Sequence, residues 1–292
     1  MKYYKIISAN GGSRFAVEQE EGLLSDLTSV DENLSGLEVI ARAASLSGVS
    51  IDQIAERIIE SGQPSILKMD EVLDEKSDLR LARPFDPPEV WGAGATYNKD
   101  LSKASESYIK IYQAERPMLF FKATPQRCVG PFESVGIRED SAVNIPEPEL
   151  AFVLYQGEIL GYTIANDMSA VSLEGENTYY QPQAKVYNQS CSIGPCFVTA
   201  ESIKNPEDLD LRCSTRRDNE VVWHGESSTS HLARSCVQLA DWIQRSNSMP
   251  DLTTVLTGCD CHPPSGFTLQ QGDVISITIA GIGTLENTVI VV

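Results

Sequence analysis

The chain has 292 residues, 41% of them hydrophobic, and a formal net charge of −18 from 41 acidic and 23 basic side chains. This composition is typical of a globular protein, and the length allows one large or two ordinary domains. A surface this acidic disfavours binding to nucleic acid and to anionic membranes. No apolar run is long enough to span a bilayer and the N-terminus shows no signal sequence, so we expect a cytoplasmic protein.

The first part of the chain predicts a small α+β domain. Residues 1–30 alternate as short strands and turns, and amphipathic helices are expected to begin near Gly36 and at Ile51. Asp52 is a plausible capping position for the second helix. A proline-rich connection follows between Ala82 and Gly94. We therefore predict one domain over residues 1–82 and a larger one over residues 83–292.

The larger domain is predicted to be rich in β-structure. A helix is expected from Asp100 to about Ala114, because Pro117 prevents its continuation, and the segment MLFFKAT then predicts a buried strand. Beyond Pro146 the pattern is mostly strand and turn, and the C-terminal segment predicts a closing hairpin. The fold class is therefore α+β.

One predicted hairpin carries three carboxylates. Glu147 and Glu149 lie two positions apart on a strand, so their side chains share a face. A turn signal follows at Gly157. If the hairpin folds about that glycine, Asp167 lies opposite Glu147, and the three side chains converge at the open end of the hairpin.

Three neighbouring carboxylates repel one another unless one is protonated or a cation lies between them. Oxygen ligands with room for water suit Mg²⁺, with Mn²⁺ as a substitute. The alternative is a solvated acidic strand edge in a protein that is acidic throughout. The residues alone leave both interpretations open.

Other polar residues are candidates for substrate chemistry. Lys185 lies in a polar segment, residues 172–195, that we expect outside the core. Near a metal and a substrate carboxylate its pKa can be lowered, so that it acts as a base. Glu115 is a second candidate base, and Arg116 and Lys122 could bind a substrate anion. The alternative is that these side chains are ordinary exposed charges, with the cations paired to surface acids.

The C-terminal part contains Cys259, Cys261 and His262 in close succession. This cluster raises the possibility of a zinc site. However, no second pair of ligands lies at the spacing of a zinc finger, which favours ordinary thiols in a loop.

Several motifs occur in the order found in a known family. The runs PEPELAFV, GYTIANDMS, EGENTYYQPQAKVY and SIGP, with the closing segment, resemble the fumarylacetoacetate hydrolase superfamily over roughly residues 90–292. The runs AERPMLFFKA, EGEN and QPQAK are most similar to its 2-keto-3-deoxy-pentonate dehydratase branch.

The resemblance implies a rolled mixed β-sheet fold with a small N-terminal domain, and a homodimer or homotetramer. It implies that Glu147, Glu149 and Asp167 bind Mg²⁺ and that Lys185 lies beside a small 2-keto acid. The implied reaction is the Mg²⁺-dependent dehydration of a 2-keto-3-deoxy pentonate to 2-oxoglutarate semialdehyde. The alternatives are a C–C hydrolase of acylpyruvates and an oxaloacetate decarboxylase.

The sequence departs from the family at two places. Hydrolases of the superfamily often carry a His–Glu pair that activates water, but Asp100 and Lys103 stand at those positions here. A family TGT motif, which binds substrate through a hydroxyl, reads TGC here, and its Gly258 and Cys259 are the candidate substrate-binding residues. The first departure favours dehydration, with proton transfer by Lys185 and by acids of the EGEN loop, Glu174 and Glu176. The second leaves the contact at Cys259 open.

Overall fold

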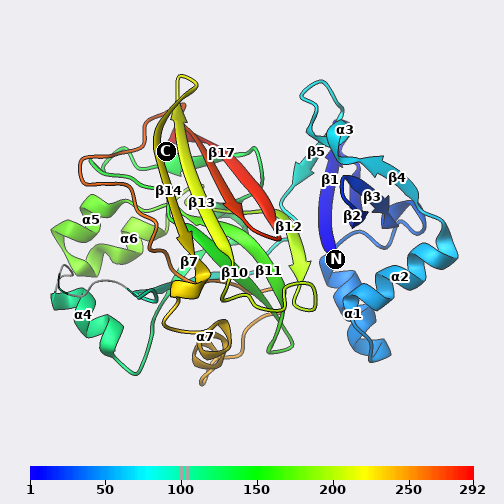
Figure 1. Cartoon of the computed structure of the whole chain (residues 1–292), viewed down its shortest axis with the longest axis horizontal. Helices are drawn as coiled ribbons and strands as arrows, with labels where there is room; N and C mark the ends of the chain where they lie inside the picture. The colour runs from blue at the N-terminus through cyan, green and yellow to red at the C-terminus, as the bar shows by residue number, and fades with distance from the viewer. Residues whose placement is uncertain (99–101, 103–105) are drawn as a thin grey trace.

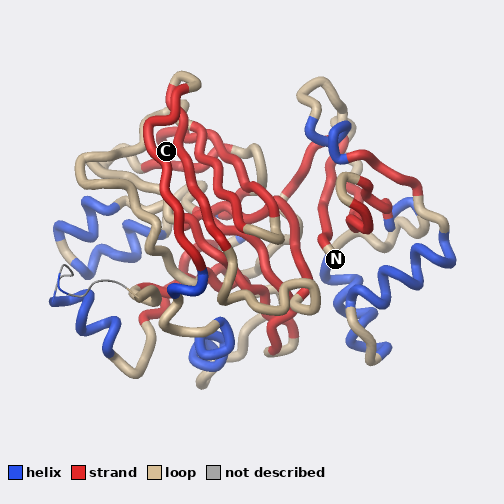
Figure 2. The backbone as a smooth tube through the Cα atoms, viewed as in Figure 1, coloured by secondary structure: helices blue, strands red, loops and turns tan. Residues whose placement is uncertain are grey.

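The computed structural model describes residues 1–98, 102 and 106–292. Figures 1 and 2 show strands gathered into two regions, with helices at the outside of each. The helices are α1 (Leu37–Ser47), α2 (Ile51–Gly62), α3 (Met69–Leu73), α4 (Glu106–Gln113), α5 (Val171–Glu176), α6 (Gln181–Lys185) and α7 (Cys236–Ile243). The strands are β1 (Lys2–Ser8), β2 (Ser13–Glu20), β3 (Leu23–Asp26), β4 (Ser65–Lys68), β5 (Leu79–Ala82), β6 (Val90–Gly94), β7 (Met118–Ala123), β8 (Cys128–Val129), β9 (Ser134–Ile137), β10 (Pro148–Tyr155), β11 (Glu158–Asp167), β12 (Cys191–Thr199), β13 (Asp210–Arg217), β14 (Glu220–Ser228), β15 (Thr254–Leu256), β16 (Val274–Ile279) and β17 (Gly283–Val291).

The described strands form two sheets. The larger follows the order β4-β3-β2-β1-β12-β11-β10-β15-β6-β7, with β5 paired to β1 and β8 paired to β12. The smaller follows the order β14-β13-β16-β17-β9. Both mix parallel and antiparallel neighbours, since β15 runs parallel to β6 and β17 parallel to β9. The mixed sheets with flanking helices agree with the predicted α+β class.

The central strand β10 faces two separate cores. All eight of its residues are buried. Leu150, Phe152 and Leu154 point into a core shared with β16 and β17 of the second sheet. Ala151 and Val153 point into a core shared with the N-terminal helices. This division follows from the two-residue period of a strand and explains why β10 reads as a continuous apolar run.

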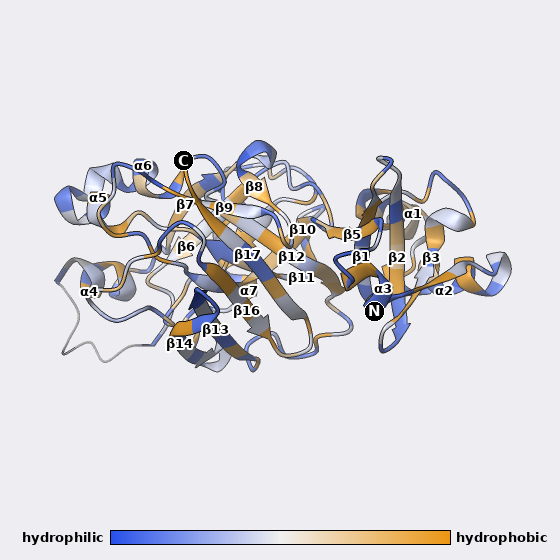
Figure 3. Cartoon of the chain, turned by 90° about the horizontal axis from the view of Figure 1, so that it is seen from above, coloured by the Kyte–Doolittle hydropathy of each residue, from blue (hydrophilic) through white to orange (hydrophobic). Residues whose placement is uncertain are grey.

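The N-terminal strands join the same large sheet through one short ladder. Lys2 of β1 pairs with Val198 of β12, and Tyr3 pairs with Phe197. Figures 1 and 3 place β1–β5 and α1–α3 at one end of the molecule and α4–α6 at the other. Figure 3 also shows that hydrophobic residues concentrate in the strands between these ends. None of the helices in the described ranges is long and apolar enough to cross a membrane.

Several details differ from the sequence-based expectations. The cap of α2 is Ser50, whose side chain forms a reciprocal capping box with Gln53, and Asp52 instead accepts a hydrogen bond from Tyr3. The polar segment 172–195 folds as α5 and α6, and its last residues belong to the buried strand β12. The start of the helix expected from Asp100 lies outside the described residues, and α4 covers its later part.

Candidate active site

The carboxylate-bearing hairpin is formed by β10 and β11. Its turn consists of Gln156 and Gly157, both with positive φ (51° and 84°), as the tight turns of twisted hairpins require. From this turn alone, Glu147 would lie opposite Asn166. A bulge at Leu160 shifts the register by one residue, so Pro148 pairs with Asn166 and the backbone N–H of Asp167 donates to the carbonyl of Glu147 at 3.0 Å.

This register brings the three predicted carboxylates together. Glu147, Glu149 and Asp167 each offer an oxygen within 4.8 Å of the others. Asp167 is fully buried, Glu149 is 2% exposed, and the side chain of Glu147 is 16% exposed. The solvated-edge alternative is therefore wrong, because two of the three carboxylates are withdrawn from water.

Lys185 lies against this carboxylate cluster. Its ammonium donates to Glu147 Oε2 at 2.7 Å, to Asp167 Oδ2 at 2.9 Å and to Ser169 Oγ at 2.5 Å. Burial alone would lower the pKa of Lys185, but Asp167, Glu147 and Glu174 together raise it well above its usual value. The lowered pKa considered for this lysine is thus not found. The same ammonium lowers the pKa of Glu147 against the opposing effect of burial.

Among the described residues, no lysine or arginine forms an ion pair with Glu149. Burial, reinforced by Asp167 and Glu147, raises the pKa of its carboxyl group well above the ordinary value. Its Oε2 accepts a hydrogen bond from the backbone N–H of Gly258 at 2.5 Å. Gly258 has a φ of +98°, and a Cβ there would lie 1.9 Å from Thr96 Oγ1, so no other residue fits without rearrangement. Gly258 therefore holds a carboxylate, whereas we expected it to contact substrate.

A pocket of about 340 Å³ opens over the carboxylates. Its apolar lining residues are Ala93, Ala95, Ile111, Met118 and Phe120. The remaining lining residues are Gly94, Tyr108, Glu147, Glu149, Asp167, Glu174, Thr178, Gln181, Lys185, Cys259 and His262. Burial raises the pKa of Glu174, an effect opposed by Lys185 and reinforced by Glu147.

His262 was not assigned to this site from the sequence. The loop that follows β15 carries it back to the pocket beside Cys259, and its charge helps to lower the pKa of Glu147. His262 lies 95 residues after Asp167 in the chain, so no local sequence pattern indicated that the two residues line the same pocket. The zinc interpretation of this loop gains no support, since the acidic cluster is the only group of three possible metal ligands within the described residues.

Other predicted residues lie away from the pocket. Glu115 and Arg116 are exposed, and the guanidinium of Arg116 lies 4.8 Å from the centre of the Trp242 ring. Glu176 is also exposed and does not line the pocket. Asp100 and Lys103 lie outside the described residues.

Lys122 lies beneath the pocket floor, fully buried. Its ammonium is 2.5 Å from Asp167 Oδ1 and donates to the carbonyls of Met168 and Lys185 at 2.9 and 2.6 Å. The contact with Asp167 is an ion pair without hydrogen-bond geometry, since Oδ1 of Asp167 has no hydrogen-bond partner among the described residues. Because Lys122 is fully buried and does not line the pocket, the expected contact between Lys122 and a substrate anion gains no support.

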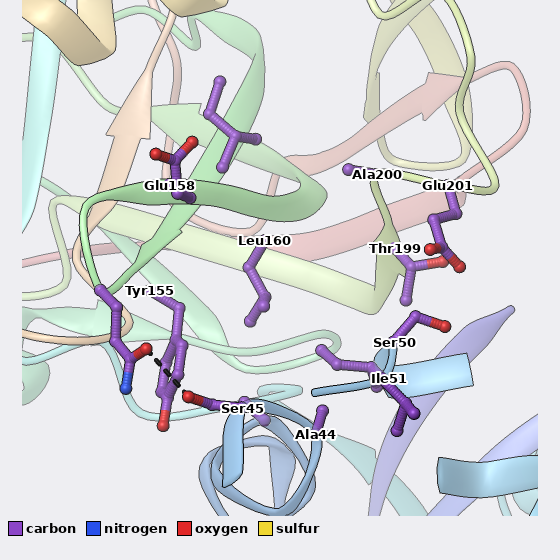
Figure 4. Close-up of a pocket in the computed structure, with 14 residues that line it drawn as sticks. Ala44, Ser45, Ser50, Ile51, Tyr155, Glu158, Leu160, Thr199, Ala200 and Glu201 are labelled. Carbon is purple, nitrogen blue, oxygen red and sulfur yellow. Dashed lines mark hydrogen bonds between the residues drawn. The ribbon is translucent and has the colours of Figure 1, made fainter. Parts of the chain in front are cut away.

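A second hollow of about 390 Å³ lies between the N-terminal helices and the tip of the β10–β11 hairpin. Figure 4 shows Ala44, Ile51, Tyr155 and Leu160 around it, with Ser45 donating to Gln156 at 2.9 Å. Its two carboxylates come from Glu158, at the start of β11, and from Glu201, in the turn after β12, and no lysine or arginine is among its described lining residues. The carboxylate cluster and Lys185 instead line the 340 Å³ pocket.

Residues 89–290 match the family model described as "Fumarylacetoacetate (FAA) hydrolase C-terminal". The chain belongs to the fumarylacetoacetate hydrolase family. This family member is 41% identical over 295 residues to a "Probable 2-keto-3-deoxyxylonate dehydratase" of Haloferax volcanii, with 99% of each chain covered. It is 40% identical over 243 residues, 80% of each chain, to the 2-dehydro-3-deoxy-D-arabinonate dehydratase of Saccharolobus solfataricus.

The structure of this family member is also similar to a solved dehydratase. That structure is 2-keto-3-deoxy-D-arabinonate dehydratase complexed with magnesium and 2,5-dioxopentanoate. The TM-score is 0.84 at 34% identity, covering 100% of this chain and 99% of the other. The predicted fold, with a small N-terminal region before the family domain, is confirmed by this similarity.

Proposed function

We propose that this protein is a Mg²⁺-dependent dehydratase of a 2-keto-3-deoxy pentonate, forming 2-oxoglutarate semialdehyde (2,5-dioxopentanoate). The observation that carries the proposal is the buried cluster of Glu147, Glu149 and Asp167 with Lys185 at its edge. The similarity to two dehydratases of such acids over 80–99% of the chain supports the same reaction.

The residues present fit a hard divalent cation. All three donors are carboxylate oxygens within 4.8 Å of one another, the ligand type that Mg²⁺ prefers. Burial, and then the charges of Asp167 and Glu147, raise the pKa of Glu149, so ionisation of all three carboxylates is unfavourable and a cation between them would relieve this. Bound Mg²⁺ would polarise the carbonyl of a 2-keto acid and acidify its C3 protons.

The chain's own groups account for the proton transfers. Lys185 Nζ lies at the pocket wall beside the carboxylates, where its ammonium can hold the negative charge that develops on the substrate. To take a proton from C3 it must first lose its own, which a cation bound to Glu147 and Asp167 would favour by offsetting the two carboxylates that raise its pKa. Glu174 lines the same pocket, and its raised pKa favours the protonated acid that a leaving C4 hydroxyl needs. The hydroxyl leaves as water once it is protonated, so the reaction consumes no external water.

Part of the pocket wall is apolar. Ile111, Met118 and Phe120 line the pocket and are each partly accessible, and the ring centre of Phe120 lies 5.4 Å from Lys185 Nζ. Cys259 lies near the carboxylates, and burial and then Glu147 raise the pKa of its thiol, so it stays a neutral group. A neutral wall of this kind suits a substrate with a single carboxylate and an uncharged hydroxylated tail.

The domain boundary near residue 82 and a homodimer or homotetramer remain proposals. The boundary is supported by the end of β5 at Ala82 and by the start of the family match at residue 89. The oligomer is supported by the family resemblance. Gel filtration with light scattering measures the assembly directly.

The test of the function is a panel of 2-keto acids incubated with the protein and Mg²⁺ and followed by mass spectrometry. A 2-keto-3-deoxy pentonate should lose one water, while an acylpyruvate and oxaloacetate should remain intact. Rapid release of pyruvate from the acylpyruvate, with the sugar acid unchanged, would show a C–C hydrolase instead. Loss of carbon dioxide from oxaloacetate alone would show a decarboxylase.

A further inference from the structure

Lys122 is the only lysine among the fully buried side chains of the described residues. A buried ammonium is costly unless it is paired and hydrogen-bonded throughout. The ammonium has one ion-pair partner, Asp167, and two hydrogen-bond acceptors, the carbonyls of Met168 and Lys185. These partners come from two separate segments, because Asp167 ends strand β11 and Met168 follows it, whereas Lys185 ends helix α6.

The two oxygens of Asp167 therefore have different partners. Oδ1 lies 2.5 Å from Lys122 Nζ beneath the pocket, and Oδ2 lies 2.9 Å from Lys185 Nζ at the pocket wall. The ion pair with Lys122 restrains the rotation of the carboxylate and leaves Oδ2 toward Lys185, which lines the pocket. Lys122 also holds the backbone carbonyl of Lys185 at 2.6 Å, which places the start of that side chain.

We propose that Lys122 is a positioning residue that aims Asp167 Oδ2 at the metal and fixes Lys185 relative to it. It acts through these two residues and does not touch the substrate. Tyr187, whose ring centre lies 5.7 Å from Lys122 Nζ, packs beside the ammonium. The inference rests on the proposed function for the identity of the metal, whereas the contacts of Lys122 with Asp167 and Lys185 do not depend on the reaction.

The test compares Lys122→Met and Lys122→Gln with the unchanged protein. Methionine keeps an unbranched chain and removes all three donors, whereas glutamine keeps two donors without the charge. Lys5→Met is the matched control, because Lys5 pairs with Asp86 at 3.2 Å in an exposed ion pair of the N-terminal region. Three quantities are measured on each folded variant: the Mg²⁺ dissociation constant by calorimetry without substrate, kcat at saturating Mg²⁺, and KM.

If Lys122 positions the ligands, Lys122→Met weakens Mg²⁺ binding by about 10- to 100-fold, as loss of a group that orients a metal ligand typically does. The kcat at saturating Mg²⁺ also falls, KM stays within about twofold, and Lys122→Gln lies between Lys122→Met and the unchanged protein. The control variant binds Mg²⁺ like the unchanged protein. If Lys122→Met does not fold, the same comparison on Lys122→Gln decides.

Two results would overturn the proposal. A rise in KM with unchanged Mg²⁺ affinity and kcat would make Lys122 a substrate contact. A lower melting temperature with all three constants unchanged would make it a purely structural group. Mg²⁺ binding that depends on Lys122 in a protein that fails to dehydrate would uphold the positioning role and refute the proposed reaction, whereas no Mg²⁺ binding by the unchanged protein would refute both.

Discussion

Two isosteric substitutions in the carboxylate cluster should have different effects on stability. Asp167 lies between two ammonium groups, with its oxygens 2.5 Å from Lys122 and 2.9 Å from Lys185, all nearly or fully buried. Asp167→Asn leaves these cations without their shared counter-charge. Breaking a buried ion pair by removing one partner costs about 3–5 kcal/mol.

Without bound metal, Glu149→Gln should lower the free energy of unfolding far less than Asp167→Asn does. Burial and the neighbouring carboxylates already favour the protonated acid, which the glutamine amide mimics in shape and charge. The amide oxygen can still accept the hydrogen bond from Gly258. We therefore expect the free energy of unfolding to change by no more than about 1 kcal/mol, close to the effect of an ordinary surface substitution.

The assay is thermal unfolding by circular dichroism in excess chelator. For a chain of this size, 1 kcal/mol corresponds to roughly 2–4 °C, so Asp167→Asn should lower the melting temperature by roughly 6–20 °C. Glu149→Gln should leave it nearly unchanged or raise it. Both variants should lose most of their Mg²⁺ affinity. Equal losses of stability in the two variants would refute the reasoning, because they would show that the two carboxylates have equivalent surroundings.

Three further outcomes follow from the same site. Lys185→Met should lower kcat by about 10²–10⁴-fold, the usual contribution of a positioned proton-transfer group. Arg116→Ala should retain activity, because Arg116 lies away from the pocket. Equal losses of kcat in the two variants would contradict the placement of both residues. Because the folded-state pKa of Glu149 lies above its ordinary value of 4.5, its contribution to the unfolding free energy is full below that pH and is lost as the pH rises through the folded pKa. In excess chelator, the unchanged protein should therefore become less stable relative to Glu149→Gln as the pH rises. A difference in unfolding free energy that does not change with pH would contradict this expectation. With a net charge of −18, the melting temperature should also rise between low salt and molar KCl as self-repulsion is screened, and an unchanged value would show that the surface charges are too dispersed to matter.

The convergence of the carboxylates was predictable because a strand has a simple period. Glu147 and Glu149 share a face on any strand, and a turn signal at Gly157 placed Asp167 within reach. The assumed pivot gave the observed register only because the bulge at Leu160 compensates for the two-residue turn. No local sequence pattern predicts that bulge, so the sequence alone did not determine the exact pairing.

The remaining parts of the site depend on contacts between distant segments. Lys122 and Glu115 are charged residues seven positions apart, yet one is fully buried under Asp167 and the other is exposed. Their difference is set by the pairing of β7 with β6 and by the position of α6, neither of which a local pattern specifies. His262 reaches the pocket for the same reason, through a loop whose path depends on the whole sheet.

The most direct test of the account is the rate of dehydration of a 2-keto-3-deoxy pentonate measured against free Mg²⁺ concentration. We expect no measurable dehydration in excess chelator and full recovery of the rate when Mg²⁺ is restored. In Glu149→Gln and Asp167→Asn, added Mg²⁺ should not restore the rate. Full activity in excess chelator would contradict the central claim that the three carboxylates act by holding a metal ion.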